Sequence, residues 1–135
     1  MNYYAVIDTN VLVSSMLKGT SIPGIIVEKA LNGPIIPLLN DEIMKEYEEV
    51  LLRNKFGLDE SSVKVLIDEL KKRAIFLDRT EIIEKFDDPD DIVFYEIVMT
   101  ARTSVEAYLI TGNKKHYPIK PFVVTPREML DIVGE

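Results

Sequence analysis

The chain has 135 residues, of which 16 are Lys or Arg and 23 are Asp or Glu, so its formal charge is −7. It has no cysteine and one histidine, which excludes disulfide scaffolds, thiol catalysis and metal sites built from several Cys or His side chains. The length is typical of one domain, roughly 100–150 residues, so we expect a single domain over residues 1–135. The negative charge argues against a protein held to nucleic acid by overall basicity.

The sequence shows no sign of membrane insertion or export. No apolar run reaches the roughly 18 residues that a membrane span requires. The N-terminus lacks a basic segment followed by a long apolar stretch, so we expect no signal peptide. Since the absence of cysteine is compatible with a reducing compartment, we expect a cytoplasmic protein with no membrane contact.

The first half of the chain alternates apolar runs typical of strands with patterns typical of helices. Strands are predicted at residues 3–7 and 35–39, and Pro37 marks the second as an edge strand. Helices are predicted at residues 11–17, 25–31, 41–54 and 60–73, with Asn40 and Asp59 as N-caps of the last two.

The second half continues the alternation. Strands are predicted at residues 74–77, 107–110 and 121–124, and helices at 88–102 and 126–132. This order predicts an α/β fold, a three-layer sandwich with a mainly parallel five-stranded sheet flanked by helices. Because ligands of such sheets bind outside the carboxyl ends of the strands, the residues that follow each strand are the candidates for a site.

Four acidic residues are candidates. Asp8 comes directly after the first strand, where its alternative role is to cap the next helix. Asp88 and Asp91 open a helix that is apolar almost all round; capping explains part of this acidity, but side chains three residues apart also converge. Glu46 is the acid of helix 41–54 that leans furthest toward the apolar face, although a solvated boundary glutamate is the simpler reading.

These acids can meet at one edge of the sheet. Like charges at one site raise each other's pKa unless a cation compensates for them. Mg²⁺ and Mn²⁺ prefer carboxylate oxygens and water and need neither Cys nor His. The sequence therefore predicts a Mg²⁺ or Mn²⁺ site.

Four segments carry a resemblance to a known family. They are residues 6–14 (VIDTNVLVS), 42–51 (EIMKEYEEVL), 88–91 (DPDD) and 109–116 (LITGNKKH). Each motif is loose by itself, but their order and spacing in a chain of this length are fairly specific. Together they resemble the PIN-domain family of metal-dependent ribonucleases, and most of all its toxin components of toxin–antitoxin pairs.

The resemblance implies a PIN-like fold and hydrolysis of RNA phosphodiester bonds with Mg²⁺ or Mn²⁺. Carried over by position, Asp8, Glu46 and Asp91 are the catalytic residues and bind the metal, with Asp88 as a further ligand near the site. It also implies RNA as the substrate, a homodimer, and an antitoxin protein as a candidate partner.

Residues beside the acids complete the implied site. Thr9, Asn10 and Thr111 look like residues that orient the acids. The family's Thr/Ser-Gly-Asp segment usually supplies a further aspartate, whereas this chain has Asn113. Asparagine keeps a carbonyl oxygen but removes a negative charge, so we expect one metal ion to be held more firmly than a second.

A basic segment borders the predicted site. Lys114, Lys115 and His116 follow the fourth strand, and we expect them to contact the RNA backbone. The alternative for each lysine is a solvated surface position. His116 is not expected to bind metal, because a lone histidine in a basic loop is more often exposed.

Two other functions stay open. Asp8 would serve as a phosphorylated nucleophile in a phosphotransferase or phosphatase, but one such class needs a second aspartate at the position of Asn10 and another needs paired acids after the first strand. Trapping of an aspartyl phosphate would identify that class. A PIN-like module with weakened chemistry that binds RNA or protein is the second alternative, and Asn113 supports it.

Overall fold

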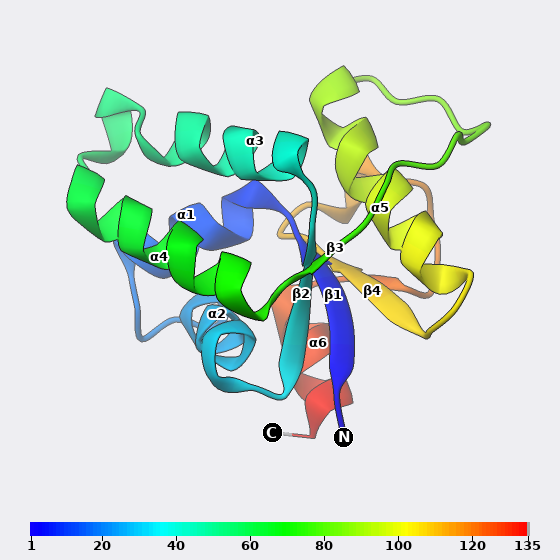
Figure 1. The fold of residues 1–135 in the computed structure, drawn as a ribbon, viewed down its shortest axis with the longest axis horizontal. Helices are drawn as coiled ribbons and strands as arrows, with labels where there is room; N and C mark the ends of the chain where they lie inside the picture. Colours follow the sequence, from blue (N-terminus) through cyan, green and yellow to red (C-terminus); the bar gives the residue numbers. More distant parts are fainter. Residues whose placement is uncertain (135) are drawn as a thin grey trace.

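The computed structural model describes residues 1–134, and its centre is a five-stranded parallel sheet (Figure 1). The last residue of the predicted domain, residue 135, lies outside the described part. The strands are β1 (Tyr3–Ile7), β2 (Ile35–Leu39), β3 (Ile75–Phe76), β4 (Ala107–Ile110) and β5 (Val123–Val124). Their spatial order is β3-β2-β1-β4-β5, and every neighbouring pair is parallel. The predicted α/β sandwich is confirmed.

Helices cover both faces of this sheet (Figure 1). They are α1 (Thr9–Leu17), α2 (Ile22–Asn32), α3 (Asp41–Leu51), α4 (Glu60–Arg73), α5 (Ile92–Arg102) and α6 (Pro126–Val133). Helix α5 packs against β1, β2 and β4, while α2 packs against β2 and α6 against β5. Helix α3 contacts α1, α4 and α5, and lies beside the carboxyl ends of the strands (Figure 1).

No single helix in residues 1–134 has the length and hydropathy to cross a membrane; α1 and α2 meet that requirement only as a pair bent by 106°.

The order of the strands creates a switch point beside β1. The chain builds the sheet from β1 outward through β2 to β3, then returns to the other side of β1 with β4 and β5. The carboxyl ends of β1 and β4 are therefore neighbours, with Ile7 paired to Ile110. Asp8 and Thr111 follow these two residues, so the fold brings side chains about 100 residues apart to one place.

Pro37 lies inside the sheet, and the prediction that β2 is an edge strand is wrong. The carbonyl of Leu39 accepts a hydrogen bond from the backbone N–H of Leu77, on the side of β3. Pro37 is two residues earlier, so its nitrogen faces the same side. Because this side faces away from β1, and because β3 pairs with β2 only from Leu38 onward, the missing N–H of Pro37 interrupts no hydrogen bond to either neighbouring strand.

Several predicted boundaries differ from the observed ones. Strands β1, β2 and β4 and helix α4 have the predicted bounds. Helix α2 begins three residues early, because the hydroxyl of Ser21 caps it by accepting from the N–H of Gly24 at 3.3 Å. The predicted helix 88–102 begins instead with a 3₁₀ turn, η2 (Pro89–Asp91). The predicted strands 74–77 and 121–124 shorten to two residues each, and helix 41–54 ends at Leu51.

Tyr47 joins α3 to the end of β1. Its hydroxyl donates a hydrogen bond of 2.5 Å to the carbonyl of Ile7, the residue before Asp8. The side chain is 1% exposed and lies against Phe94 of α5, with ring centroids 6.2 Å apart. Burial raises the pKa of Tyr47, so the phenol stays protonated and acts as a donor. Tyr47 therefore fixes α3 over the strand end that carries Asp8.

We expect Tyr47→Phe to lower the free energy of unfolding by about 1–2 kcal/mol, because it leaves a buried carbonyl without this donor. The measurement is chemical denaturation at pH 7. Tyr108→Phe is the matched control: its hydroxyl bonds to the exposed Glu106 carboxylate, so its loss costs roughly 0.5 kcal/mol or less. Equal effects of the two substitutions would contradict this role of Tyr47.

Candidate active site

Asp8 is a buried carboxyl at the switch point. It is 6% exposed, and its backbone N–H donates to the carbonyl of Ile110, which extends β1 pairing into the site. Burial raises the pKa of Asp8, an effect opposed by hydrogen bonds from Thr111 and Tyr117. Although Asp8 stands at the N-cap position of α1, its side chain makes no capping hydrogen bond. The backbone N–H groups of Asn10 and Thr9 nevertheless help to lower the pKa of this carboxyl, so Asp8 also interacts with the start of α1.

Three side-chain donors converge on one oxygen of Asp8. The hydroxyl of Thr111 lies 2.7 Å from Oδ2, the hydroxyl of Tyr117 lies 3.1 Å from it, and Nδ2 of Asn10 lies 3.4 Å from it. Asn10 also accepts from the N–H of Gly112 at 3.2 Å, which ties the start of α1 to the segment after β4. Thr111 and Asn10 thus contact Asp8 as predicted, and Tyr117 was not predicted from the sequence. Its only sequence signal is an aromatic residue directly after a polar segment.

Asp91 is the second acid at this end of the sheet. Burial raises its pKa to about 6, and the charges of Asp8 and Asp88 contribute to that rise. Asp88 is exposed, and its side chain accepts a hydrogen bond from the N–H of Asp90 at 2.9 Å. Asp88 is therefore the N-cap of η2, the role that capping alone would give it. The charges of Asp8 and Asp91 therefore repel each other, and the exposed Asp88 adds to the repulsion on Asp91.

Glu46 belongs to the same acidic region but has different neighbours. It is half-buried on α3, whereas Glu42, Glu48 and Glu49 on the same helix are exposed, as its helical position predicted. Burial raises its pKa, and repulsion from Asp90 adds to that rise. Glu46 is therefore within electrostatic range of the η2 turn.

These acids do not surround one point. Within residues 1–134, no three Asp, Glu or His side chains lie close enough to share a metal ion. Asp91 instead interacts with the charges of Asp8 and Asp88, while Glu46 interacts with the charges of Asp90 and Asp88. Mg²⁺ usually keeps several waters and binds one or two carboxylates directly, so such an arrangement suits it.

Thr9, whose predicted role was to orient the acids, has a buried hydroxyl with no hydrogen-bond partner in the described structure, so a polar group is available beside Asp8. The oxygen donors present fit a hard divalent cation.

The basic segment after β4 divides into residues with different partners. The ammonium of Lys114, which was predicted to contact RNA, pairs with Glu128 of α6 at 3.0 Å. Because this carboxylate offsets the positive charge, Lys114 is less available to an RNA phosphate than an unpaired lysine. Lys115 is exposed. His116 lies with Nδ1 3.6 Å from Oδ2 of Asp91 and Nε2 3.0 Å from Nδ2 of Asn113. Asn113 thus holds His116 beside Asp91.

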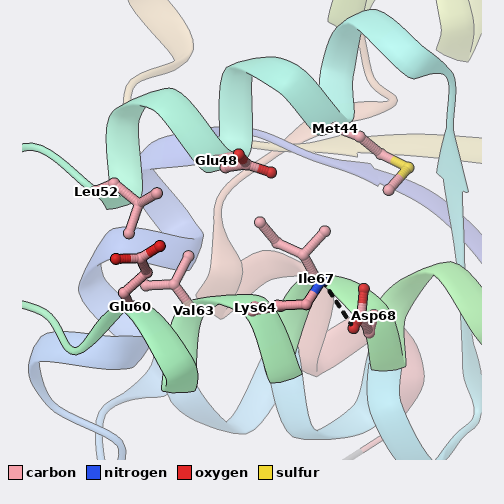
Figure 2. Close-up of a pocket in the computed structure, with 8 residues that line it drawn as sticks. All are labelled: Met44, Glu48, Leu52, Glu60, Val63, Lys64, Ile67 and Asp68. Atoms are coloured by element: carbon pink, nitrogen blue, oxygen red, sulfur yellow. Dashed lines mark ion pairs between the residues drawn. The ribbon is translucent and has the colours of Figure 1, made fainter.

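A separate hollow lies between α3 and α4, with a volume of about 310 Å³. Figure 2 shows Met44, Val63 and Ile67 between the two helices, and the ion pair of Lys64 with Asp68 at its rim, with Nζ and Oδ2 3.7 Å apart. None of its lining residues belongs to the predicted site.

Comparisons with known proteins bear on the family and the fold. A sequence model of the PIN domain matches residues 4–115 of the chain. A chain in the crystal structure of VapBC2 from Rickettsia felis, bound to a DNA fragment from their promoter, has a similar fold with a TM-score of 0.54. The two chains share 12% sequence identity over 90% of this chain and 96% of that one, so the likeness concerns the fold alone. No curated protein sequence matches the chain.

The raised pKa of Asp91 makes a pH-dependent stability testable. A carboxyl with a raised folded-state pKa favours folding below its ordinary value of 3.8, and that contribution is lost as the pH rises through about 6. Asp91→Asn avoids this loss. At pH 7, without divalent cations, we expect the variant to be more stable than the parent by roughly 1–2 kcal/mol, a value reduced for solvent screening at a half-buried group.

The measurement is denaturation in the presence of a chelator at pH 4 and pH 7. The gain should appear at pH 7 and shrink at pH 4, where Asp91 of the parent is protonated. Asp87→Asn, which removes the same charge from an exposed neighbour, should change stability by less than about 0.5 kcal/mol at both pH values. A destabilised Asp91→Asn at pH 7 would show that the carboxylate is not under electrostatic strain.

Proposed function

The chain belongs to the PIN-domain family, and we propose that it is an endoribonuclease that hydrolyses RNA phosphodiester bonds with Mg²⁺ or Mn²⁺. The observation that carries this proposal is the pair of acids at the switch point. Asp8 is buried with no basic side chain within ion-pair distance in the described structure, and its charge helps to raise the pKa of Asp91. A divalent cation offsets that repulsion.

The acids and their hydrogen-bond donors have different roles in this proposal. Asp8 and Asp91 would hold the ion. The side-chain donors of Asp8 all contact the same carboxylate oxygen, Oδ2. Thr111 and Tyr117 keep that carboxylate in one orientation. Glu46 orients a water molecule from the side of α3.

When bound, the ion would make a water molecule acidic enough to attack a phosphodiester at neutral pH and would stabilise charge on the phosphoryl group. The protein excludes bulk water from one side of this centre, because Asp8 and Thr111 are buried. Lys115 and His116 provide positive charge at the rim, where the RNA backbone approaches.

The same proposal extends to partners. The similar chain from Rickettsia felis is part of a complex named VapBC2, which supports a toxin role for this chain with an antitoxin protein as partner. Such a pair acts in the cytoplasm, and homodimerisation is proposed from the family resemblance. A small DNA-binding reading frame beside the gene is the observation that would support this role.

We expect Asp8→Asn to reduce Mn²⁺-dependent cleavage of single-stranded RNA by more than about 100-fold, because it removes a charged ligand from the centre of the site. The assay uses purified full-length protein, with a chelator to stop the reaction. Asp131→Asn, an exposed aspartate of α6, is the matched control and should cleave like the parent. Undiminished cleavage by a folded Asp8→Asn protein would reject this assignment.

The weakened binding module is the second candidate, because Asn113 stands where the family usually has an aspartate. Calorimetric titration with Mn²⁺ separates the two functions. A nuclease site should bind Mn²⁺ and lose that binding in Asp91→Asn. RNA binding by the parent without measurable Mn²⁺ binding or cleavage would favour the module.

A further inference from the structure

A pocket of about 320 Å³ lies beside the candidate active site, between residues 84–87 and residues 115–118. The first segment precedes η2 and the second follows β4, so distant parts of the chain form its two sides. We propose that this pocket binds one nucleotide of single-stranded RNA next to the phosphate that is cleaved. The inference rests on the proposed ribonuclease function and adds a binding site to it.

The pocket shares a wall with the acids. Two consecutive lining residues touch them: the hydroxyl of Tyr117 donates to Oδ2 of Asp8 at 3.1 Å, and Nδ1 of His116 lies 3.6 Å from Oδ2 of Asp91. Tyr117 and His116 therefore each contact both the pocket and one of the two acids. This continuity favours a substrate subsite over an unrelated docking hollow.

Two lysines line the pocket, one from each of the two segments that form it. Lys85 and Lys115 are exposed, and neither makes a side-chain hydrogen bond or ion pair with any residue in 1–134. Other lysines nearby do have acidic partners, as Lys120 pairs with Glu84 at 3.9 Å. Two unpaired cations at one pocket repel each other, and a phosphodiester anion between them would remove that repulsion.

The two acids that line the pocket form no ion pair with Lys85 or Lys115 in the described residues, so the positive charge of these lysines is available to a ligand. The carboxylate of Glu84 accepts from the hydroxyl of Tyr95 at 2.8 Å and meets Lys120, so both groups lower its pKa and hold it in place. Asp87 is exposed at the rim and is the remaining acid. Because the whole chain carries −7, RNA affinity must depend on such local cations.

Phe86 gives the pocket an aromatic wall. Its ring is half-buried and is held by two others, with centroids 5.4 Å from Tyr95 and 5.9 Å from Tyr117, the latter edge-to-face at 78°. These contacts fix the ring while part of it lines the pocket. A fixed aromatic face beside lysines is the arrangement that binds single-stranded nucleic acid, because a base stacks on the ring and its phosphate meets the cation. An acidic peptide would use the lysines but not the ring.

The test measures binding apart from cleavage. All proteins carry Asp8→Asn in the full-length chain, so that the RNA stays intact, and the probe is a short fluorescent oligouridylate followed by anisotropy. Phe86→Leu keeps the apolar volume but removes the stacking face, so we expect Kd to rise at least about fivefold. Lys85→Gln with Lys115→Gln should raise Kd and lower the slope of log Kd against log salt by about 0.7 per lysine.

Matched controls lie elsewhere on the surface. Phe76→Leu, on the exposed strand β3, and Lys71→Gln, near the end of α4, should bind like the parent. Thermal melting checks that each variant folds. If Phe86→Leu does not fold, Phe86→Tyr, which keeps the stacking face, should bind normally, and the lysine variant carries the test.

The outcomes separate this inference from the proposed function. Loss of RNA binding in the Phe86 and lysine variants supports the subsite even if the parent with intact Asp8 cleaves no RNA, a result that would reject only the nuclease. Unchanged Kd in both variants overturns the subsite, whether or not the parent cleaves RNA. Displacement of the RNA by polyglutamate, with no effect of Phe86→Leu, also overturns it and assigns the pocket to an acidic protein.

Discussion

The buried carboxyl of Asp8 is the constraint on which the arrangement of the site depends. A carboxylate at the end of the central strand loses its hydration, and hydrogen bonds from Thr111 and Tyr117 replace only part of it. Both donors come from the segment after β4, so they reach Asp8 only because β4 lies next to β1. The strand order, the burial of Asp8 and the conformation of residues 111–117 are therefore one linked structural requirement.

A second buried acid shows how the same chain treats a carboxylate with a structural role. Glu96 of α5 is 8% exposed, and Arg79 binds it through Nε at 2.6 Å while also donating to Glu42 of α3 at 2.7 Å. That arginine compensates the buried charge and joins two helices. In residues 1–134 Asp8 has no such basic partner, and its neighbour Asp91 has only His116. The contrast shows that Asp8 and Asp91 lack the arginine compensation that Glu96 has, which agrees with the raised pKa values of both acids.

The sequence predicted what depends on local pattern. The alternation of elements predicts the parallel sheet, which is confirmed, and Asp8 and Asp91 are candidates because each stands beside a strand end or a helix start. Contacts between distant segments were not predictable in this way. Tyr117 is 109 residues from Asp8, and Arg79 reaches Glu96 from a segment with no regular structure. The pairing of Lys114 with Glu128 likewise depends on where α6 packs, which periodicity does not encode.

The contacts of Asn113 with Thr111 and His116 show what an asparagine does at this position. An aspartate there would add another negative charge near Asp91, whose pKa is already raised by Asp8 and Asp88. The asparagine amide instead contacts His116, which lies beside Asp91 and, when protonated, lowers the pKa of that carboxyl. The backbone N–H of Asn113 also donates to Thr111, which in turn donates to Asp8. Compared with an aspartate, Asn113 therefore carries one negative charge fewer at this end of the sheet, and its hydrogen bonds connect the surroundings of both acids.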